Sequence, residues 1–255
     1  QGCYGGGSLV FEHVRVGLLP ESVLHFVQAM ASPSDALRLH YFRGRGLAEV
    51  IRFALGLAGA EWEDVFLDKR SDLHALRSSG KVLFGQVPML EAEGRMLVQS
   101  GTILRYIARR WNLYGDEILT DTAIEAANDF ASAVLSLPFK RAQGEDLTIN
   151  MSEMRVHWLP QYCGAFEVVL MDNPWLGGSS PTVGDAAVLR VVDEIVEYLG
   201  EHCLESWPRV LDWRVRLLEH PNIQAFMQSP HHLPSPAKAE VACAYAKAVQ
   251  AAMSA

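Results

Sequence analysis

Apolar residues in this chain follow two different periods, and the change between them limits the possible folds. Alternation over residues 37–42, which include aromatic side chains, predicts a strand. Over residues 47–58 apolar residues recur every three or four positions, which predicts a helix with one buried face that ends before Gly59. Residues 62–67 predict a second strand. A helix between two strands is typical of a βαβ unit, in which the strands run parallel.

The mixed pattern continues for about 45 further residues. A looser segment, 68–85, contains a short predicted helix. Residues 88–92 and 96–98 flank a turn at Gly94, which predicts a β-hairpin. Residues 100–111 carry apolar side chains on one helical face. The sequence therefore predicts a small α/β domain of βαβ and ββα units.

Strand signals disappear after residue 112, and only helical periodicity follows. We predict a domain over residues 37–112, a linker at 113–118 and an all-helical domain over 119–255. The helices expected there cover about 120–142, 150–172, 184–201, 208–218 and 237–253. The fold class is thus α/β followed by all-α.

Residues 1–36 are expected to be an extension outside the folded domains. Gln1-Gly2 has the form of a protease-cleavage scar, and a glycine run follows. The extension lacks the basic start and unbroken apolar core of a signal peptide. Met30 reads as a natural start, and a short helix over 22–30 is an alternative for part of this segment.

Composition and charge exclude several functions. The formal net charge is −8, whereas broad nucleic-acid binding needs a basic face. No window reaches the length of apolar sequence that crosses a membrane. The four cysteines are far apart and form no C-x-x-C, which argues against a disulfide framework or zinc site and fits a reducing, cytoplasmic location. His231 and His232 lie among prolines and are predicted to form a loop rather than a metal site.

Several motifs occur together in a recognisable order. They are Leu39-His40-Tyr41-Phe42, Arg45-Gly46-Leu47-Ala48, Phe84-Gly85-Gln86-Val87-Pro88-Met89 and Leu97-Val98-Gln99-Ser100. In this order and spacing the chain resembles the cytosolic glutathione transferases of the tyrosine type, closest to the alpha class. The resemblance implies a thioredoxin-like amino-terminal domain, a helical carboxy-terminal domain, glutathione as cosubstrate and no covalently bound cofactor or metal.

Tyr41 is the candidate catalytic residue. In the family a tyrosine at this place donates a hydrogen bond to the glutathione sulfur. A free thiol has a pKa near ~8.5, and lowering it by about two units requires roughly 2.7 kcal/mol. One hydrogen bond to a charged group supplies about 1.5–3 kcal/mol, so a single phenol suffices. No cysteine lies near this turn, which argues against thiol–disulfide exchange.

Other residues are assigned to glutathione by the resemblance. Val87 is expected to pair with the cysteinyl unit through its backbone, with Pro88 in the cis form. Ser100 is expected to be the N-cap of the next helix and to hold the γ-glutamyl carboxylate there. The remaining expected glutathione-binding residues are Tyr41 itself, Arg77, Gln86, Gln99 and Asp129. For Arg77 a solvated arginine is the alternative, and for Asp129 the match requires one helical turn to be deleted after Gly115.

Leu47 is the main departure from the alpha pattern. The alpha class carries an arginine there that supports the thiolate, whereas the mu class carries leucine. Losing that charge leaves Tyr41 as the chief stabiliser of the thiolate. An alpha-class arginine of a later helix also has no clear counterpart, with His157 and Gln161 as the candidates.

A second-substrate pocket and a homodimer are also implied. Phe42, Leu47 and Phe139 are expected to line the pocket, and the final helix to cover it. Phe84 lies on an otherwise exposed loop and is expected to plug into a partner subunit.

The predicted function is a glutathione transferase that adds the thiolate to hydrophobic electrophiles, with organic peroxide reduction open to the same thiolate. A glutathione-dependent isomerase is one alternative. A non-catalytic relative that binds apolar ligands or has a structural role is the other. The intact set of Tyr41, Gln86, Val87, Gln99 and Ser100 favours the enzymes.

Overall fold

The computed structural model describes residues 36–253. The predicted extension, including its possible helix over 22–30 and the start at Met30, lies outside the described residues apart from Ala36. No helix in the described part of the chain is long and apolar enough to cross a membrane.

Four strands form one mixed sheet, as the alternating segments predict. They are β1 (Leu37–Tyr41), β2 (Trp62–Phe66), β3 (Met89–Ala92) and β4 (Arg95–Val98), in the order β2-β1-β3-β4. β1 pairs with β2 in parallel and with β3 antiparallel, and β3 and β4 form the expected hairpin. Four of the five residues of β1 are buried because the strand lies inside the sheet.

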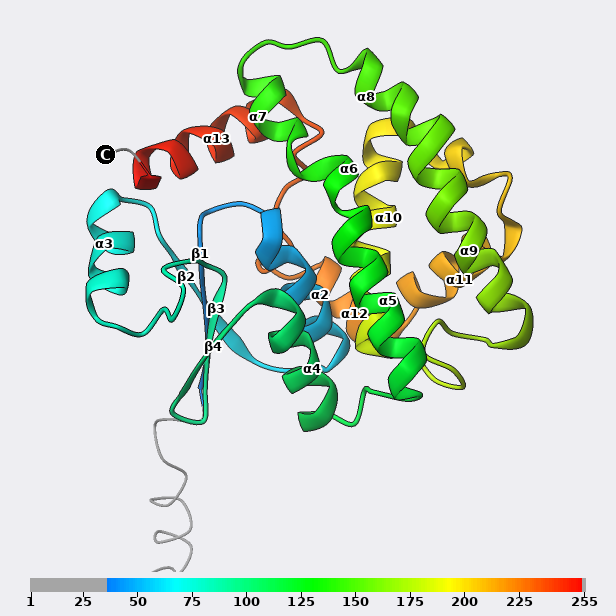
Figure 1. The fold of residues 1–255 in the computed structure, drawn as a ribbon, viewed down its shortest axis with the longest axis horizontal. Helices are drawn as coiled ribbons and strands as arrows, with labels where there is room; N and C mark the ends of the chain where they lie inside the picture. Colours follow the sequence, from blue (N-terminus) through cyan, green and yellow to red (C-terminus); the bar gives the residue numbers. More distant parts are fainter. Residues whose placement is uncertain (1–35, 254–255) are drawn as a thin grey trace, which may run out of the picture. The chain divides into compact units, whose positions relative to one another are not determined.

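Helices cover both faces of this sheet (Figure 1). One side carries α2 (Glu49–Leu57), which follows the short η2 (Gly46–Ala48), and α4 (Ser100–Arg110), whereas α3 (Arg70–Ser78) lies on the other side. Every residue of α2 is buried, because α2 also packs against α4, α10 and α12. The segment that follows Tyr41 is therefore fixed between the sheet and the helical half.

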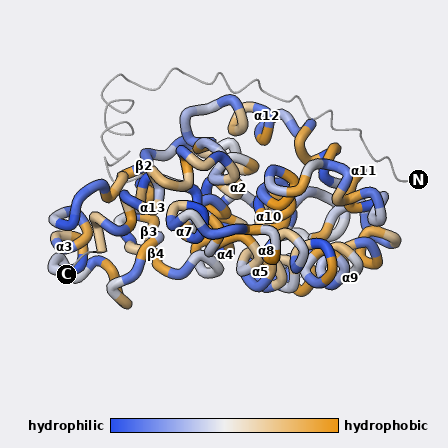
Figure 2. The backbone as a smooth tube through the Cα atoms, turned by 90° about the horizontal axis from the view of Figure 1, so that it is seen from above, coloured by the Kyte–Doolittle hydropathy of each residue, from blue (hydrophilic) through white to orange (hydrophobic). Residues whose placement is uncertain are grey.

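The carboxy-terminal half contains only helices, as predicted, but with more breaks. Its elements are α5 (Glu117–Phe130), α6 (Ser132–Leu135), α7 (Leu137–Ala142), α8 (Thr148–Glu153), the π-helical η3 (Met154–Trp158), α9 (Leu159–Asp172), α10 (Val183–Leu199), η4 (Glu201–Leu204), α11 (Pro208–Leu218), α12 (Pro221–Met227) and α13 (Ala239–Met253). Figure 2 shows hydrophilic and hydrophobic stretches alternating along α5 and α9, as expected for helices with one face in a core.

Two long helices expected from periodicity are wrong as continuous elements. The stretch 120–142 divides into α5, α6 and α7, and 150–172 divides into α8, η3 and α9. Pro138 and Pro160 occupy the first turns of α7 and α9, where a proline needs no helical hydrogen bond. Periodicity continued across both breaks, so it did not reveal them.

α10 forms the centre of the helical half, and nearly all of its residues are buried. Thr182 and Asp185 form a capping box, in which each side chain accepts the other residue's backbone N–H. The Asp185 carboxylate also accepts from Trp213 Nε1 at 2.8 Å. Because α10 packs against both α2 and α5, it brings its side chains close to the turn after β1.

Candidate active site

Tyr41 is the last residue of β1, and its side chain is 5% exposed. The chain turns sharply after it and enters η2, whose Leu47 N–H donates to the Tyr41 hydroxyl at 3.1 Å. A phenol oxygen can accept two hydrogen bonds and donate one. The backbone therefore holds the oxygen of Tyr41 from one side and leaves its proton available for another acceptor.

Tyr245 of α13 covers this turn, where the sequence predicted a covering helix. Its hydroxyl lies 3.4 Å from the hydroxyl of Tyr41. The ring lies against Gly44 and Gly46, and a Cβ at either glycine would collide with the Tyr245 side chain. Burial raises the pKa of Tyr245 above its usual value, and the neighbouring Tyr41 adds to that rise. Tyr245 therefore stays protonated across the physiological range.

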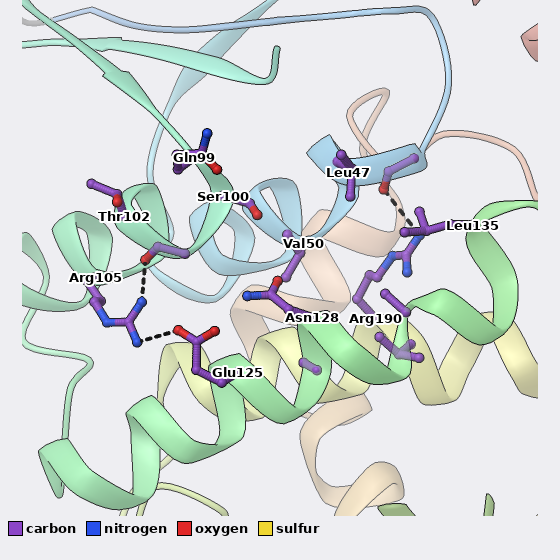
Figure 3. Close-up of a pocket in the computed structure, with 15 residues that line it drawn as sticks. Leu47, Val50, Gln99, Ser100, Thr102, Arg105, Glu125, Asn128, Leu135 and Arg190 are labelled. Carbon is purple, nitrogen blue, oxygen red and sulfur yellow. Dashed lines mark hydrogen bonds and ion pairs between the residues drawn. The ribbon is translucent and has the colours of Figure 1, made fainter. Parts of the chain in front are cut away.

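A cavity of about 430 Å³ lies below this turn, between α4, α5 and α10 (Figure 3). Gln99 and Ser100 line it, as does Leu47, which projects into it from η2. The other lining residues are Gly46, Val50, Gly101, Thr102, Arg105, Glu125, Ala127, Asn128, Ala131, Leu135, Arg190 and Val191. Tyr41 itself does not line the cavity, so the predicted catalytic hydroxyl lies beyond its wall.

The structure corrects the prediction that Ser100 is the N-cap of α4. Gln99 is the N-cap residue, with φ +69°, and its side chain makes no capping hydrogen bond. Ser100 is the first helical residue. A positive φ is uncommon for glutamine and is most often found at functional sites. The amino end of α4 therefore faces the cavity without a side-chain cap, which leaves its first backbone N–H groups suited to an anion.

Arg105 is the main charged group in the cavity that the sequence analysis did not identify. Its guanidinium pairs with Asp121 at 2.9 Å and with Glu125 at 2.7 Å. Figure 3 shows the pair with Glu125. Asn128 lies one helical turn after Glu125 on the same face of α5 and also lines the cavity. In the sequence, only the three-residue spacing of Glu125 and Asn128 indicated that both lie on one face of α5.

Asp129 is exposed and is not among the cavity residues. The structure therefore does not bring Asp129 together with Ser100 within one chain. His157 and Gln161, the two candidates for the missing arginine, are both exposed on the surface of η3 and α9.

The loop before β3 carries the other predicted glutathione residues. The peptide bond between Val87 and Pro88 is cis, as the resemblance implies. Arg77 on α3 donates from Nε to the carbonyl of Gly85 at 2.8 Å, so it lies directly beside this loop. Gln86 is exposed, Val87 is half-buried and Pro88 is buried. None of these residues is among those that line the cavity of Figure 3.

The predicted pocket and interface residues occupy different environments. Phe42 is buried, with its ring centroid 5.1 Å from that of Tyr41. Phe139 of α7 is half-buried and contacts Tyr245 at a centroid distance of 5.5 Å. Phe42 and Phe139 thus lie near the two tyrosines and do not line the cavity that Leu47 lines. Phe84 is 59% exposed on its loop.

His231 and His232 lie in a loop, as predicted, and each has an acidic side chain beside it. His231 Nδ1 lies 2.7 Å from Asp64 Oδ2, and His232 Nδ1 lies 3.7 Å from Glu49 Oε1. Burial lowers the pKa of His232, and the charge of Arg45 adds to this effect. Within residues 36–253 no group of histidine, cysteine and acidic side chains is arranged to hold a metal ion.

Comparisons with known proteins agree with this architecture. Residues 37–109 match the family model described as "Glutathione S-transferase, N-terminal domain", and residues 128–230 match "Glutathione S-transferase, C-terminal domain". The chain is 35% identical over 210 residues to human Glutathione S-transferase A3, which covers 79% of this chain and 93% of that protein. It is 32% identical over 197 residues to rat Glutathione S-transferase alpha-4, covering 75% and 87% respectively.

A solved structure gives the same result in three dimensions. The crystal structure of the glutathione S-transferase from Ascaris lumbricoides superposes with a TM-score of 0.67 and 27% identity, covering 79% of this chain and 99% of that one. Both domains, the sheet order and the helical half are accounted for by one family. The chain therefore belongs to the cytosolic glutathione S-transferase family, closest to its alpha class, and is an enzyme that uses glutathione as its cosubstrate.

Proposed function

We propose that Tyr41 activates glutathione in this enzyme by holding its sulfur as a thiolate. The observation that carries the proposal is the hydrogen bond from Leu47 N–H to the Tyr41 hydroxyl at 3.1 Å. An oxygen that accepts from a backbone donor is fixed in position, and its own O–H is a stronger donor as a result. The site is buried, so a hydrogen bond to a thiolate there is stronger than in water.

The thiolate then attacks a hydrophobic electrophile. The thiol proton passes to solvent, the sulfur lone pair forms a bond to the electrophilic carbon, and the leaving group departs with its bonding electrons. Apolar side chains near Tyr41 support a hydrophobic second substrate, with Phe42, Phe139 and Leu47 as the candidate pocket residues. Organic peroxides could be reduced by the same thiolate: the sulfur attacks the peroxide oxygen, the O–O bond breaks and an alcohol leaves. A second glutathione then converts the sulfenic acid to glutathione disulfide and water.

Glutathione would be held along the edge formed by the loop before β3 and the amino end of α4. The γ-glutamyl carboxylate suits the uncapped start of α4 at Gln99 and Ser100. Val87 supplies backbone groups to the cysteinyl unit, with Gln86 and Pro88 beside it. Arg77, next to this loop, offers a cation to the glycyl carboxylate.

Two identical chains would complete the site. Asp129 faces outward on α5, where it is free to reach the γ-glutamyl ammonium of a partner subunit. Phe84 is the candidate anchor between the subunits, because it and the adjacent Leu83 are both exposed and together present an apolar surface on this loop. We place the enzyme in the cytoplasm, because its family is cytosolic and the three described cysteines are all unpaired.

Conjugation of glutathione to a generic aryl halide tests this function. We expect measurable turnover in the parent and a loss of about two orders of magnitude in kcat/KM for Tyr41→Phe, since removing one such donor costs about 2.7–4 kcal/mol. Tyr106→Phe is the matched control, because the Tyr106 hydroxyl pairs with Arg110 away from the cavity. Glutathione binding without turnover would identify a non-catalytic relative. Equal activity in the parent and Tyr41→Phe would remove Tyr41 from the mechanism.

A further inference from the structure

Arg190 is a buried cation at the turn that follows Tyr41. It lies on α10 and is 3% exposed. Its guanidinium donates to the carbonyl oxygen of Gly46 at 3.2 Å. The Nε atom is buried and has no hydrogen-bond partner among the described residues. Figure 3 shows the side chain rising from α10 toward Leu47 and the wall of the cavity that it lines.

Gly46 connects this guanidinium to the candidate catalytic hydroxyl. An ideal Cβ built on Gly46 would lie 2.6 Å from the Tyr41 hydroxyl, so the phenol reaches the immediate surface of Gly46. The Gly46 carbonyl accepts from Arg190. The charge of Arg190 also extends to Tyr245, whose pKa it lowers against the larger, opposite effect of burial. The charge of Arg190 therefore acts on the Tyr245 hydroxyl, which lies 3.4 Å from the hydroxyl of Tyr41.

Among the residues that the structure describes, Arg190 has one direct counterion. Glu194, one turn further along α10, lies 2.9 Å from the guanidinium. Burial raises the pKa of Glu194, although Arg190 and Arg45 act in the opposite direction. The pair forms a buried dipole whose positive end faces Gly46. In a buried site a dipole of this kind acts strongly on a nearby anion, because little water screens it.

Leu47, the side chain closest to the turn on the cavity side, carries no charge. We propose that Arg190 supplies, from the helical half, the positive charge that stabilises the glutathione thiolate alongside the hydrogen bond from Tyr41. This inference rests on the proposed function and adds an electrostatic residue to it. A cation within about 4–6 Å of an acid lowers its pKa by one or more units, and Glu194 reduces that effect here.

The test is a titration of enzyme-bound glutathione, followed by thiolate absorbance. The main variant is the double substitution Arg190→Gln with Glu194→Gln, which removes the pair without leaving a buried charge unpaired. We expect the pKa of the bound thiol to rise by about one unit, so that the thiolate fraction below that pKa falls about tenfold. The control is Arg214→Gln with Asp193→Asn, a buried pair between α11 and α10 that does not line the cavity. The control substitutions should leave the pKa of the bound thiol at the parental value.

Two further variants keep the inference testable if the double variant folds poorly. Glu194→Gln alone removes the counterion and should lower the pKa of the bound thiol below the parental value. Leu47→Arg, added to the double variant, places a cation on the same cavity wall, where Leu47 is 43% exposed and has room. It should return the pKa toward the parental value, whereas a double variant in which the turn after Tyr41 had lost its structure would keep a raised pKa.

The outcomes separate this inference from the proposed function. Suppose that Tyr41→Phe raises the pKa of the bound thiol, but that the double variant and Glu194→Gln both keep the parental pKa. This result would overturn the role of Arg190 and would still support the role of Tyr41. Weaker glutathione binding without any change in pKa would also overturn it, because Arg190 would then only bind the tripeptide. A parental thiol with the pKa of free glutathione would refute the proposed function itself.

Discussion

Gly44 and Gly46 determine how closely α13 approaches the candidate catalytic tyrosine. Tyr245 packs where either residue would otherwise carry a Cβ, and Gly46 also has a φ of +42°. The hydroxyls of Tyr41 and Tyr245 can be 3.4 Å apart only because Gly44 and Gly46 have no side chains. Gly44 has the ordinary backbone conformation, so any effect of a side chain there is purely steric.

Gly44→Ala should destabilise the protein through Tyr245. We expect a loss of about 1–3 kcal/mol in the free energy of unfolding, the usual cost of overpacking a buried site. In a Tyr245→Ala background the same substitution should cost less than about 0.5 kcal/mol, since the collision is removed. Urea unfolding of the four proteins measures both values.

Gly164→Ala is the control for the comparison of Gly44→Ala in the two backgrounds. It lies within α9, and its Cβ would meet only Trp207 Nε1 at 3.9 Å, so alanine should be neutral or stabilising there. Equal costs of Gly44→Ala in both backgrounds would show that Tyr245 does not pack on this turn in solution.

The strand that ends at Tyr41 could be predicted from the alternating pattern of the sequence. The cis bond before Pro88 is present as well, but it was implied only by the resemblance to the family. Arg190 could not be predicted, because it reaches Gly46 across 144 positions of sequence and nothing in its own helix distinguishes it from a surface arginine. Tyr245 reaches Tyr41 across 204 positions, and only the helix that carries it was anticipated.

At the scale of elements, α12 is the helix that periodicity missed. It has seven residues, too few for an apolar repeat to be detected. Its start is marked by Pro221 and by His220, whose Nδ1 accepts the backbone N–H of Asn222 at 3.3 Å. A histidine N-cap needs an unprotonated nitrogen, so this helix start depends on pH.

Burial lowers the pKa of His220 below its usual value. Its contribution to stability is therefore present above the unfolded pKa of about 6.5 and is lost as the pH falls through the folded pKa. We expect His220→Asn, which keeps a capping acceptor but does not titrate, to lose less stability than the parent between about pH 7.5 and 5.

The difference between parent and His220→Asn should be at most about 1 kcal/mol, the usual worth of an N-cap, because His220 is partly exposed. Urea midpoints at the two pH values measure it. Identical pH dependence in parent and variant would mean that the cap does not respond to protonation.

At the scale of the whole molecule, Phe84 and its neighbour Leu83 are the test of dimer formation. Leu83 is 75% exposed and Phe84 is 59% exposed, so the loop before β3 presents two adjacent apolar side chains. We expect the parent to have a mass in solution of twice 28.2 kDa and Phe84→Glu to have that of a single chain.

Val215→Glu is the control for the dimer, since Val215 is a 43% exposed apolar residue on α11 and should not affect the mass. Light scattering after gel filtration measures all three proteins. A monomeric parent would refute the predicted homodimer. It would also refute the proposed contact of Asp129 with the glutathione bound to a partner subunit.

The architecture of residues 36–253 could be predicted because each half of this part of the chain has a consistent local period. The arrangement of charges between α2, α10 and the loop at His231 and His232 could not. Arg45 illustrates the reason: it pairs with Glu197 at 2.8 Å and with Glu49 at 3.7 Å, and one of these partners lies on α10. Such ion pairs depend on which helices pack together. Periodicity predicts where a helix lies in the sequence but not which other helices it contacts.

The most direct test of the central claim is the pKa of the glutathione thiol in its complex with the enzyme. Thiolate absorbance, recorded between about pH 5 and 9 in the parent and in Tyr41→Phe, measures it. We expect a bound pKa about two units below the free value of ~8.5, and a value near the free one in Tyr41→Phe. A parental pKa equal to that of free glutathione, or a lowered pKa that survives in Tyr41→Phe, would contradict the claim that Tyr41 activates the thiol.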